Sequence, residues 1–141
     1  MNQYNKLIIY TDGGSRNNPG PAGIGVVIYN ERKNILKTYK EYIGEATNNI
    51  AEYKALIKGL QLAADYTKGE LEIFLDSELI VKQLNGQYKV KEEKMKRLFD
   101  EAKVLSMGFE NIKYTHIKRE LNKMADRLVN EAIDEGVSKS Y

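Results

Sequence analysis

The chain has 141 residues, the length of a single domain, and we expect one domain over residues 1–141. Its 22 Lys and Arg residues against 20 Asp and Glu residues give a net charge of +2, which neither requires nor excludes a nucleic-acid partner. The absence of Cys and the single His exclude disulfides, thiol nucleophiles, thiolate zinc sites and His-rich metal sites. Any metal would therefore be held by oxygen ligands, which favours hard cations such as Mg²⁺ or Mn²⁺.

Hydrophobic runs in the chain are short. None is long enough for a transmembrane helix, so we expect no membrane partner. The apolar run nearest the N-terminus, residues 7–10, is too short for a signal peptide. We therefore expect a cytoplasmic protein, and we expect it to be a monomer.

The first third of the chain has the pattern of β-strands. Apolar, β-branched runs predict strands over residues 7–10, 24–29 and 35–43. The first run stops at Asp12-Gly13, a pair typical of turns, and the polar residues 30–34 predict a hairpin loop. Together these predict a three-stranded antiparallel meander.

The hydrophobic period changes at residue 48. Apolar residues then recur every three or four positions, which predicts a helix over residues 49–66. The remaining predicted elements are a strand over 71–75, a short helix around 79–84, a helix over 91–106, a strand over 109–115, and a last helix lined by Leu121 to Ile133 that ends near Gly136. This order predicts an α/β fold with a mixed sheet, and we expect residues 138–141 to be loose.

Four carboxylates can each be interpreted in ordinary structural terms. Asp12 suits a turn, and Glu52 follows Asn49 by three residues, which is the spacing of a capping box. Either Asp76 or the next residue, Ser77, suits the cap of the short helix that follows. Asp126 lies inside the predicted last helix, where it caps nothing and suits a solvated helix flank.

The joint placement of these carboxylates is a stronger signal. Asp12 and Asp76 follow strands, Glu52 begins a helix, and Asp126 shares a polar stripe with Asn122 and Asn130 on the last helix. Carboxylates that converge at one sheet edge repel one another unless cations neutralise them. Two magnesium ions about 3.5–4 Å apart could do so and could clamp the attacking and leaving oxygens of a phosphodiester.

Four sequence blocks in this order resemble type 1 ribonuclease H, more closely its short archaeal-like branch. The blocks are residues 10–15 with 18–23, residues 47–52, residues 76–79 and residues 119–126, and the resemblance runs from about Lys6 to Ile133. It implies a ribonuclease H-like fold, with a five-stranded mixed sheet of order 3-2-1-4-5 flanked by helices. It also implies hydrolysis of the RNA strand of RNA–DNA hybrids, leaving 5′-phosphate and 3′-hydroxyl ends.

The resemblance also implies roles for individual residues. Asp12, Glu52, Asp76 and Asp126 would be the catalytic carboxylates that bind two Mg²⁺ ions, with Mn²⁺ as a substitute. His116 occupies the position of a mobile histidine that assists proton transfer or product release. The substrate-binding candidates are Gly13, Gly14, Asn48 and Asn49 on the RNA side, Thr47 and Asn122 at a DNA phosphate, and Asn18 in shaping the groove.

The chain departs from the family pattern in two places. Many relatives have an Arg two residues before Thr47, where this chain has Glu45, and the basic protrusion of the long bacterial branch is replaced by a short connection. These departures leave a second hypothesis open, a catalytically weak or inactive module that binds hybrid or double-stranded RNA. Cleavage of double-stranded RNA also stays open. Another nuclease of the same superfold is disfavoured by Asn48-Asn49, which suit recognition of a 2′-hydroxyl.

Overall fold

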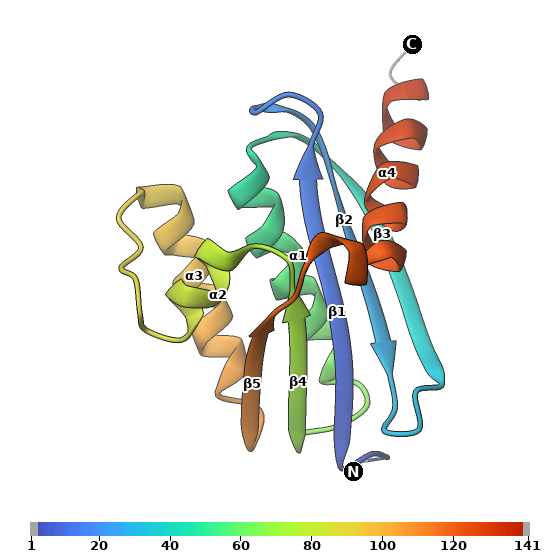
Figure 1. The fold of residues 1–141 in the computed structure, drawn as a ribbon, viewed down its shortest axis with the longest axis vertical. Coiled ribbons are helices and arrows are strands. Elements are labelled where there is room, and N and C mark those ends of the chain that lie inside the picture. The colour runs from blue at the N-terminus through green and yellow to red at the C-terminus, as the bar shows by residue number, and fades with distance from the viewer. Residues whose placement is uncertain (1–2, 140–141) are drawn as a thin grey trace.

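The computed structural model describes residues 3–139, and its five strands form one mixed sheet of order β3-β2-β1-β4-β5 (Figure 1). This confirms the predicted fold. The strands are β1 (Lys6–Ser15), β2 (Gly20–Tyr29), β3 (Ile35–Ala46), β4 (Glu70–Leu75) and β5 (Asn111–His116). The helices are α1 (Asn48–Ala63), α2 (Glu78–Leu84), α3 (Glu93–Ser106) and α4 (Lys123–Ser138), and a single 3₁₀ turn, η1 (Arg119–Leu121), precedes α4.

Strand β1 has a different pairing length on each side. Its antiparallel pairing with β2 continues to Ser15 opposite Ala22. Its parallel pairing with β4 stops earlier, at Tyr10 opposite Phe74. Beyond this point the two strands separate, and their side chains are available to build a site at the carboxyl edge of the parallel strands.

The helices cover the two faces of the sheet unequally. Helices α1 and α3 lie on one face, and α4 lies on the other (Figure 1). The main core lies beneath α1, where Tyr53, Leu56 and Leu60 pack fully buried against apolar residues of the central strands. Burial of this apolar stripe is the largest stabilising contribution to the fold.

Helix α4 approaches the sheet closely because β2 has glycine beneath it. A Cβ atom at Gly25 would lie 2.5 Å from the carbonyl oxygen of Ala125, which no real side chain could occupy. The missing side chain therefore lets the first turn of α4, which carries Asp126, rest directly on the sheet.

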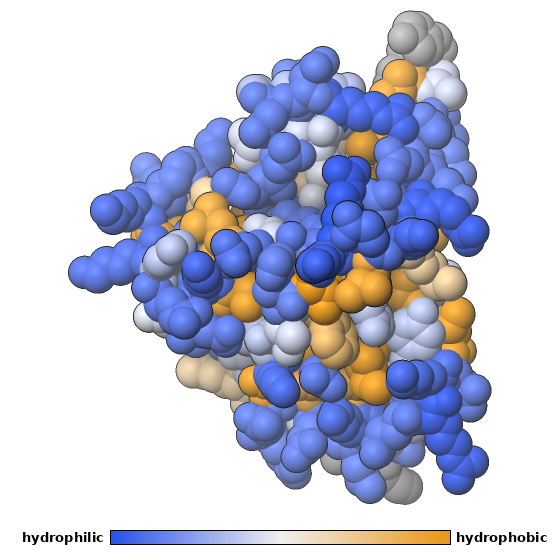
Figure 2. All heavy atoms as spheres, in the orientation of Figure 1, coloured by the Kyte–Doolittle hydropathy of each residue, from blue (hydrophilic) through white to orange (hydrophobic). Residues whose placement is uncertain are grey.

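The α4 face is only partly covered, because α4 packs mainly on β1, β2 and β3 and leaves β4 and β5 largely uncovered. Figure 2 shows apolar surface gathered over this face just below the start of α4. This surface contains a hollow of about 250 Å³, here called the apolar hollow, lined mainly by Ile8, Tyr10, Val27, Tyr29, Leu121 and Met124.

The predicted turn at Asp12-Gly13 is wrong. Both residues lie within β1, where Asp12 pairs with Gly25 and Gly13 with Ile24. The turn preference of an Asp-Gly pair is local, and it is overridden here by continued pairing with β2.

Two helix starts also differ from prediction. The N-cap of α1 is Thr47 rather than Asn49, and the Thr47 hydroxyl accepts a hydrogen bond from the Ile50 N–H at 3.2 Å. The sequence offers capping residue types at both positions, so the pattern could not choose between them. Leu121 lies in η1 and is 67% exposed, so it does not line the last helix as predicted.

The last helix extends beyond the predicted end near Gly136 and includes Ser138. Of the segment expected to be loose, residues 140 and 141 lie outside the described residues. Within residues 3–139, no helix combines the length and apolar character needed to cross a bilayer.

Candidate active site

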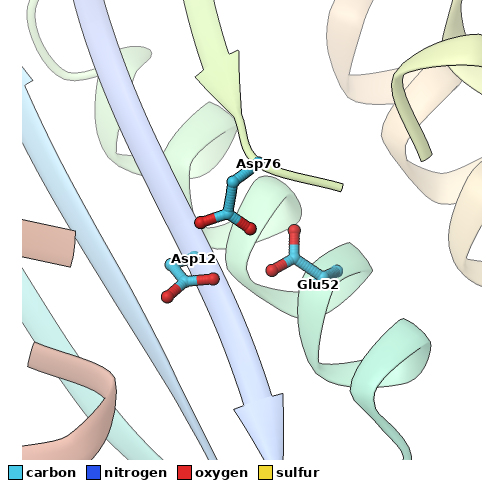
Figure 3. A group of neighbouring side chains, drawn as sticks. All are labelled: Asp12, Glu52 and Asp76. Atoms are coloured by element: carbon cyan, nitrogen blue, oxygen red, sulfur yellow. The ribbon is translucent and has the colours of Figure 1, made fainter. Parts of the chain in front are cut away.

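Three carboxylates from separate parts of the chain meet at the edge where β1 and β4 separate. Asp12 comes from β1, Glu52 from the second turn of α1, and Asp76 from the residue after β4 (Figure 3). Each offers one carboxylate oxygen, and these three oxygens all lie within 4.8 Å of one another. The carboxyl groups point toward a common centre, which is the arrangement that a multivalent cation needs.

Gly13 determines how closely Glu52 approaches β1. A Cβ atom at Gly13 would lie 2.2 Å from the carbonyl group of Ala51, so a larger residue would push α1 away from the strand. The Gly13 N–H donates a hydrogen bond to Glu52 Oε1 at 2.9 Å. The position next to Asp12 therefore both admits α1 and orients the second carboxylate.

Asp76 is held from the other side. Ser77, rather than Asp76, caps α2, and its hydroxyl accepts from the Ile80 N–H at 3.3 Å. Asp76 instead accepts a hydrogen bond from Asn122 Nδ2 at 3.1 Å. It is therefore available to the site rather than used to cap a helix.

Asp126 lines the same cleft but lies outside the group of three. It occupies the first turn of α4, not the helix interior that the sequence predicted, and it is about a third exposed. Its Oδ1 faces Arg119 Nη2 at 3.4 Å. All four predicted carboxylates thus border one cleft of about 460 Å³.

Arg119 is a residue of the cleft to which the sequence interpretation assigned no role. It lies in η1, lines the cleft and pairs with Asp126. The sequence signal that could have identified it was its position in the last sequence block, just ahead of Asn122 and Asp126. Together with Arg16, it brings positive charge to a cleft that four carboxylates line.

Burial disfavours full ionisation of the carboxylates. Burial raises the pKa of Asp12 from 3.8 to about 7, where a hydrogen bond with Glu52 opposes the shift and the charges of Asp76 and Asp126 add to it. Burial also raises the pKa of Glu52 well above its usual range, and Asp12 adds to that shift. The pKa of Asp76 is raised by burial, although Asn122, Arg119 and His116 act in the opposite direction.

The donor set fits a hard divalent cation. Two buried oxygens at the site, Glu52 Oε2 and Asn122 Oδ1, have no hydrogen-bond partner among residues 3–139. Buried polar groups are rarely left unpaired unless an ion, water or ligand completes them. Clustered carboxylate oxygens with raised pKa values are suited to Mg²⁺ or Mn²⁺, which would restore their ionised form.

The RNA-side candidates lie around the same cleft. Gly13, Gly14, Asn48 and Asn49 line it together with the carboxylates. The Ser15 N–H donates to Asn48 Oδ1 at 2.8 Å, and the Asn48 N–H donates to Asn18 Oδ1 at 3.0 Å. These bonds fix the loop after β1 against the start of α1.

The other candidates are placed elsewhere. Thr47 and Glu45 line a neighbouring groove with Lys54, Lys94 and Arg97, and these three basic residues outnumber the two acidic ones, Glu45 and Glu92. His116 ends β5 in an exposed position, and its charge acts on Asp76. Asn122 is 1% exposed and lies beneath the site rather than on its surface.

Comparisons with known proteins agree with this geometry. The family described as reverse transcriptase-like matches residues 10–132. The ribonuclease H domain of a Mycobacterium tuberculosis protein superposes with a TM-score of 0.92 and 41% identity, covering 96% of this chain and 99% of that domain. LC11 ribonuclease H1, isolated from compost, superposes with a TM-score of 0.88 and 50% identity, covering 93% of this chain and 99% of that one.

LC11 ribonuclease H1 was solved in complex with an RNA/DNA hybrid. Ribonuclease HI of Halobacterium salinarum is 42% identical over 126 residues, which are 89% of this chain and 63% of that protein. The chain spans 36% of the length of the full mycobacterial protein, which is described as bifunctional.

Proposed function

The chain belongs to the type 1 ribonuclease H family, and we propose that it is a metal-dependent endoribonuclease that hydrolyses the RNA strand of RNA–DNA hybrids. The products would carry 5′-phosphate and 3′-hydroxyl ends. The observation that carries the proposal is the convergence of Asp12, Glu52 and Asp76 within 4.8 Å, with Asp126 on the same cleft. The relatives support the substrate, since LC11 ribonuclease H1 binds an RNA/DNA hybrid.

The four carboxylates would hold two Mg²⁺ ions, for which Mn²⁺ would substitute. When bound, such ions lower the pKa of a water nucleophile and stabilise the leaving oxygen of a phosphodiester. Gly13 fixes one oxygen of Glu52, and the Asn122 amide fixes one oxygen of Asp76. The chain thereby presents its ligand oxygens already oriented, which lowers the cost of assembling the site.

Other residues would handle substrate and protons. Asn48 and Asn49 line the cleft beside Glu52, where they would meet the 2′-hydroxyl that distinguishes RNA from DNA. The groove at Thr47, with Lys54, Lys94 and Arg97, would hold the DNA strand. His116, exposed at the end of β5, would exchange a proton between the cleft and solvent.

We propose that this activity resides in a single ribonuclease H domain over residues 1–141 that acts as a monomer in the cytoplasm. Double-stranded RNA is the further substrate class that a cleavage assay must compare with the hybrid. Glu45 at the edge of the Thr47 groove is the feature that would weaken substrate binding.

The proposal is tested with an end-labelled RNA–DNA hybrid incubated with Mg²⁺, with Mn²⁺ or with a chelator. Matched duplex RNA, duplex DNA and single-stranded RNA run beside it, with Asp12→Asn as the control variant. We expect metal-dependent cutting of the RNA strand of the hybrid, absent in the variant. Binding without cutting under both metals would contradict the proposal and support the inactive binding module.

A further inference from the structure

Asn122 stands at the junction of three parts of the site. It directly precedes α4 and is 1% exposed. Its Nδ2 donates to the main-chain carbonyl oxygen of Thr11 at 2.9 Å and to Asp76 Oδ2 at 3.1 Å. One buried amide therefore joins β1 to the residue that follows β4.

These two bonds span the place where the sheet opens. The parallel pairing of β1 with β4 ends at Tyr10 and Phe74, so Thr11 and Asp76 lie beyond the last registered pair. No strand pairing holds β1 and β4 together at that level. The Asn122 amide connects the two segments there. The connection is made one residue before Asp12, and it therefore bears on where Asp12 lies relative to Asp76.

The main chain of Asn122 reaches another carboxylate residue. Its carbonyl oxygen accepts the Asp126 N–H at 3.0 Å in the first turn of α4. Asn122 is thus bonded to Asp76, to Asp126 and to the residue preceding Asp12. A displacement of Asn122 would move three of the four carboxylates relative to one another.

We propose that Asn122 is a positioning residue that sets the relative placement of Asp12, Asp76 and Asp126 for metal binding and makes no contact with substrate. This inference rests on the proposed function, because it requires a metal at these carboxylates. A side chain that is 1% exposed, with both amide hydrogens engaged, has no free donor for a phosphate of the nucleic acid. Residues that orient metal ligands act on metal affinity rather than on substrate affinity.

The test measures Mn²⁺ binding by calorimetry in the absence of nucleic acid. Asn122→Ala removes the amide, and Asn122→Leu removes both donors while keeping the branching and the number of side-chain heavy atoms of Asn. We expect Mn²⁺ affinity to fall about 10- to 100-fold in both variants. Asn85→Ala is the matched control, because it removes another Asn amide that donates to a main-chain carbonyl, that of Tyr114, and we expect its Mn²⁺ affinity to be unchanged.

A second measurement separates positioning from substrate contact. At saturating Mn²⁺, the KM of the Asn122 variants for hybrid should equal that of the unmodified chain, and only kcat should fall. Unchanged Mn²⁺ affinity with a raised KM would overturn the proposal and make Asn122 a phosphate ligand. Failure of both variants to fold, judged by circular dichroism, would also overturn it, because Asn122 would then support the whole fold.

The metal measurement keeps this inference separate from the proposed function. If the unmodified chain binds Mn²⁺ but cuts no hybrid, the proposed function fails. The loss of Mn²⁺ affinity in the Asn122 variants would still be measurable and would still support the positioning role.

Discussion

Two hollows differ in place and in chemistry, one on the α4 face of the sheet and the other at the edge where β1 and β4 separate, and β1 contributes to both through residues two apart. Tyr10 lines the apolar hollow and Asp12 lines the acidic cleft. In the apolar hollow, the Tyr10 ring stacks on Phe74 with centroids 4.9 Å apart and meets the Tyr29 ring edge-on at 5.6 Å. These ring contacts are made entirely within the chain.

In the acidic cleft, by contrast, the buried polar groups are not all satisfied within the chain. Glu52 Oε2 is buried without a partner among residues 3–139, and the pKa of Asp12 is raised to about 7 by burial. Burying an ionisable group in this way opposes folding unless a cation completes the site. The same strand therefore stabilises the fold at Tyr10 and lowers the free energy of unfolding at Asp12, which is a predicted metal ligand.

Asp12→Asn should have the largest effect of any substitution in either hollow. It removes a carboxylate from the centre of the group of three, and the loss of metal stabilisation should lower kcat by about a thousandfold or more. Single-turnover cleavage of hybrid at saturating Mg²⁺ measures the change. A variant with full activity would remove Asp12 from the reaction.

The second-largest effect should be a pH dependence of folding stability that comes from the acidic cleft and not from the apolar hollow. Because the folded pKa of Asp12 is raised above 3.8 to about 7, the metal-free protein should lose stability as pH rises through that range. The loss should be on the order of a few kcal/mol, should be smaller in Asp12→Asn, where Glu52 and Asp76 still have raised pKa values, and should largely disappear on adding Mg²⁺. Urea unfolding of the metal-free protein at a series of pH values tests this, and stability that rises with pH would contradict it.

His116→Ala tests the rim of the acidic cleft. Loss of proton exchange at the exposed end of β5 should lower kcat by about ten- to a hundredfold, with Mn²⁺ affinity kept. Lys113→Ala is a matched control on the same strand, because Lys113 is exposed and pairs with Glu72 away from the cleft. Equal kcat values for the two variants would make His116 a surface residue.

Gly13→Ala and Gly14→Ala form a matched pair next to Asp12. A Cβ atom at Gly13 would meet the Ala51 carbonyl at 2.2 Å, whereas at Gly14 the nearest atom is 3.8 Å away. Gly13→Ala should therefore cost about 1–3 kcal/mol of stability by forcing α1 from β1, and Gly14→Ala almost none. Thermal unfolding compares them, and equal stabilities would refute the close approach.

Phe74→Leu should have the smallest effect, and it should be confined to stability. It keeps an apolar side chain against Tyr10, which lines the apolar hollow, but removes the ring stacking, which should cost about 1 kcal/mol. Mn²⁺ affinity should not change. A parallel loss of metal affinity would show that the two hollows are not independent.

The sequence predicted the order of strands and helices and the four carboxylates, because those signals are local periodicity and motif spacing. It could not predict that Asp12-Gly13 continues a strand, because that depends on pairing with β2 from residues 20–29. The sequence likewise could not show why residue 13 must be Gly. The reason is that the main chain of Ala51 occupies the space that a Cβ atom would need.

The positions of Asn122 and Leu121 could not be predicted for a related reason. Asn122 looked like part of a polar stripe with Asp126, but its side chain contacts Thr11 and Asp76, which are more than forty positions away. Leu121 looked apolar enough for the core, yet the 3₁₀ turn before α4 exposes it. The position at which α4 begins decided both outcomes, and helix starts are the least certain part of a sequence pattern.

Helix α4 carries Asp126, although the other three carboxylates come from residues 12–76. During synthesis, β1, α1 and β4 are therefore made before the ribosome reaches Asn122 and Asp126. The set becomes complete only when α4 has emerged and docked on Gly25. A nascent chain that is still attached to the mRNA that encodes it therefore lacks the fourth carboxylate until most of the domain has been made.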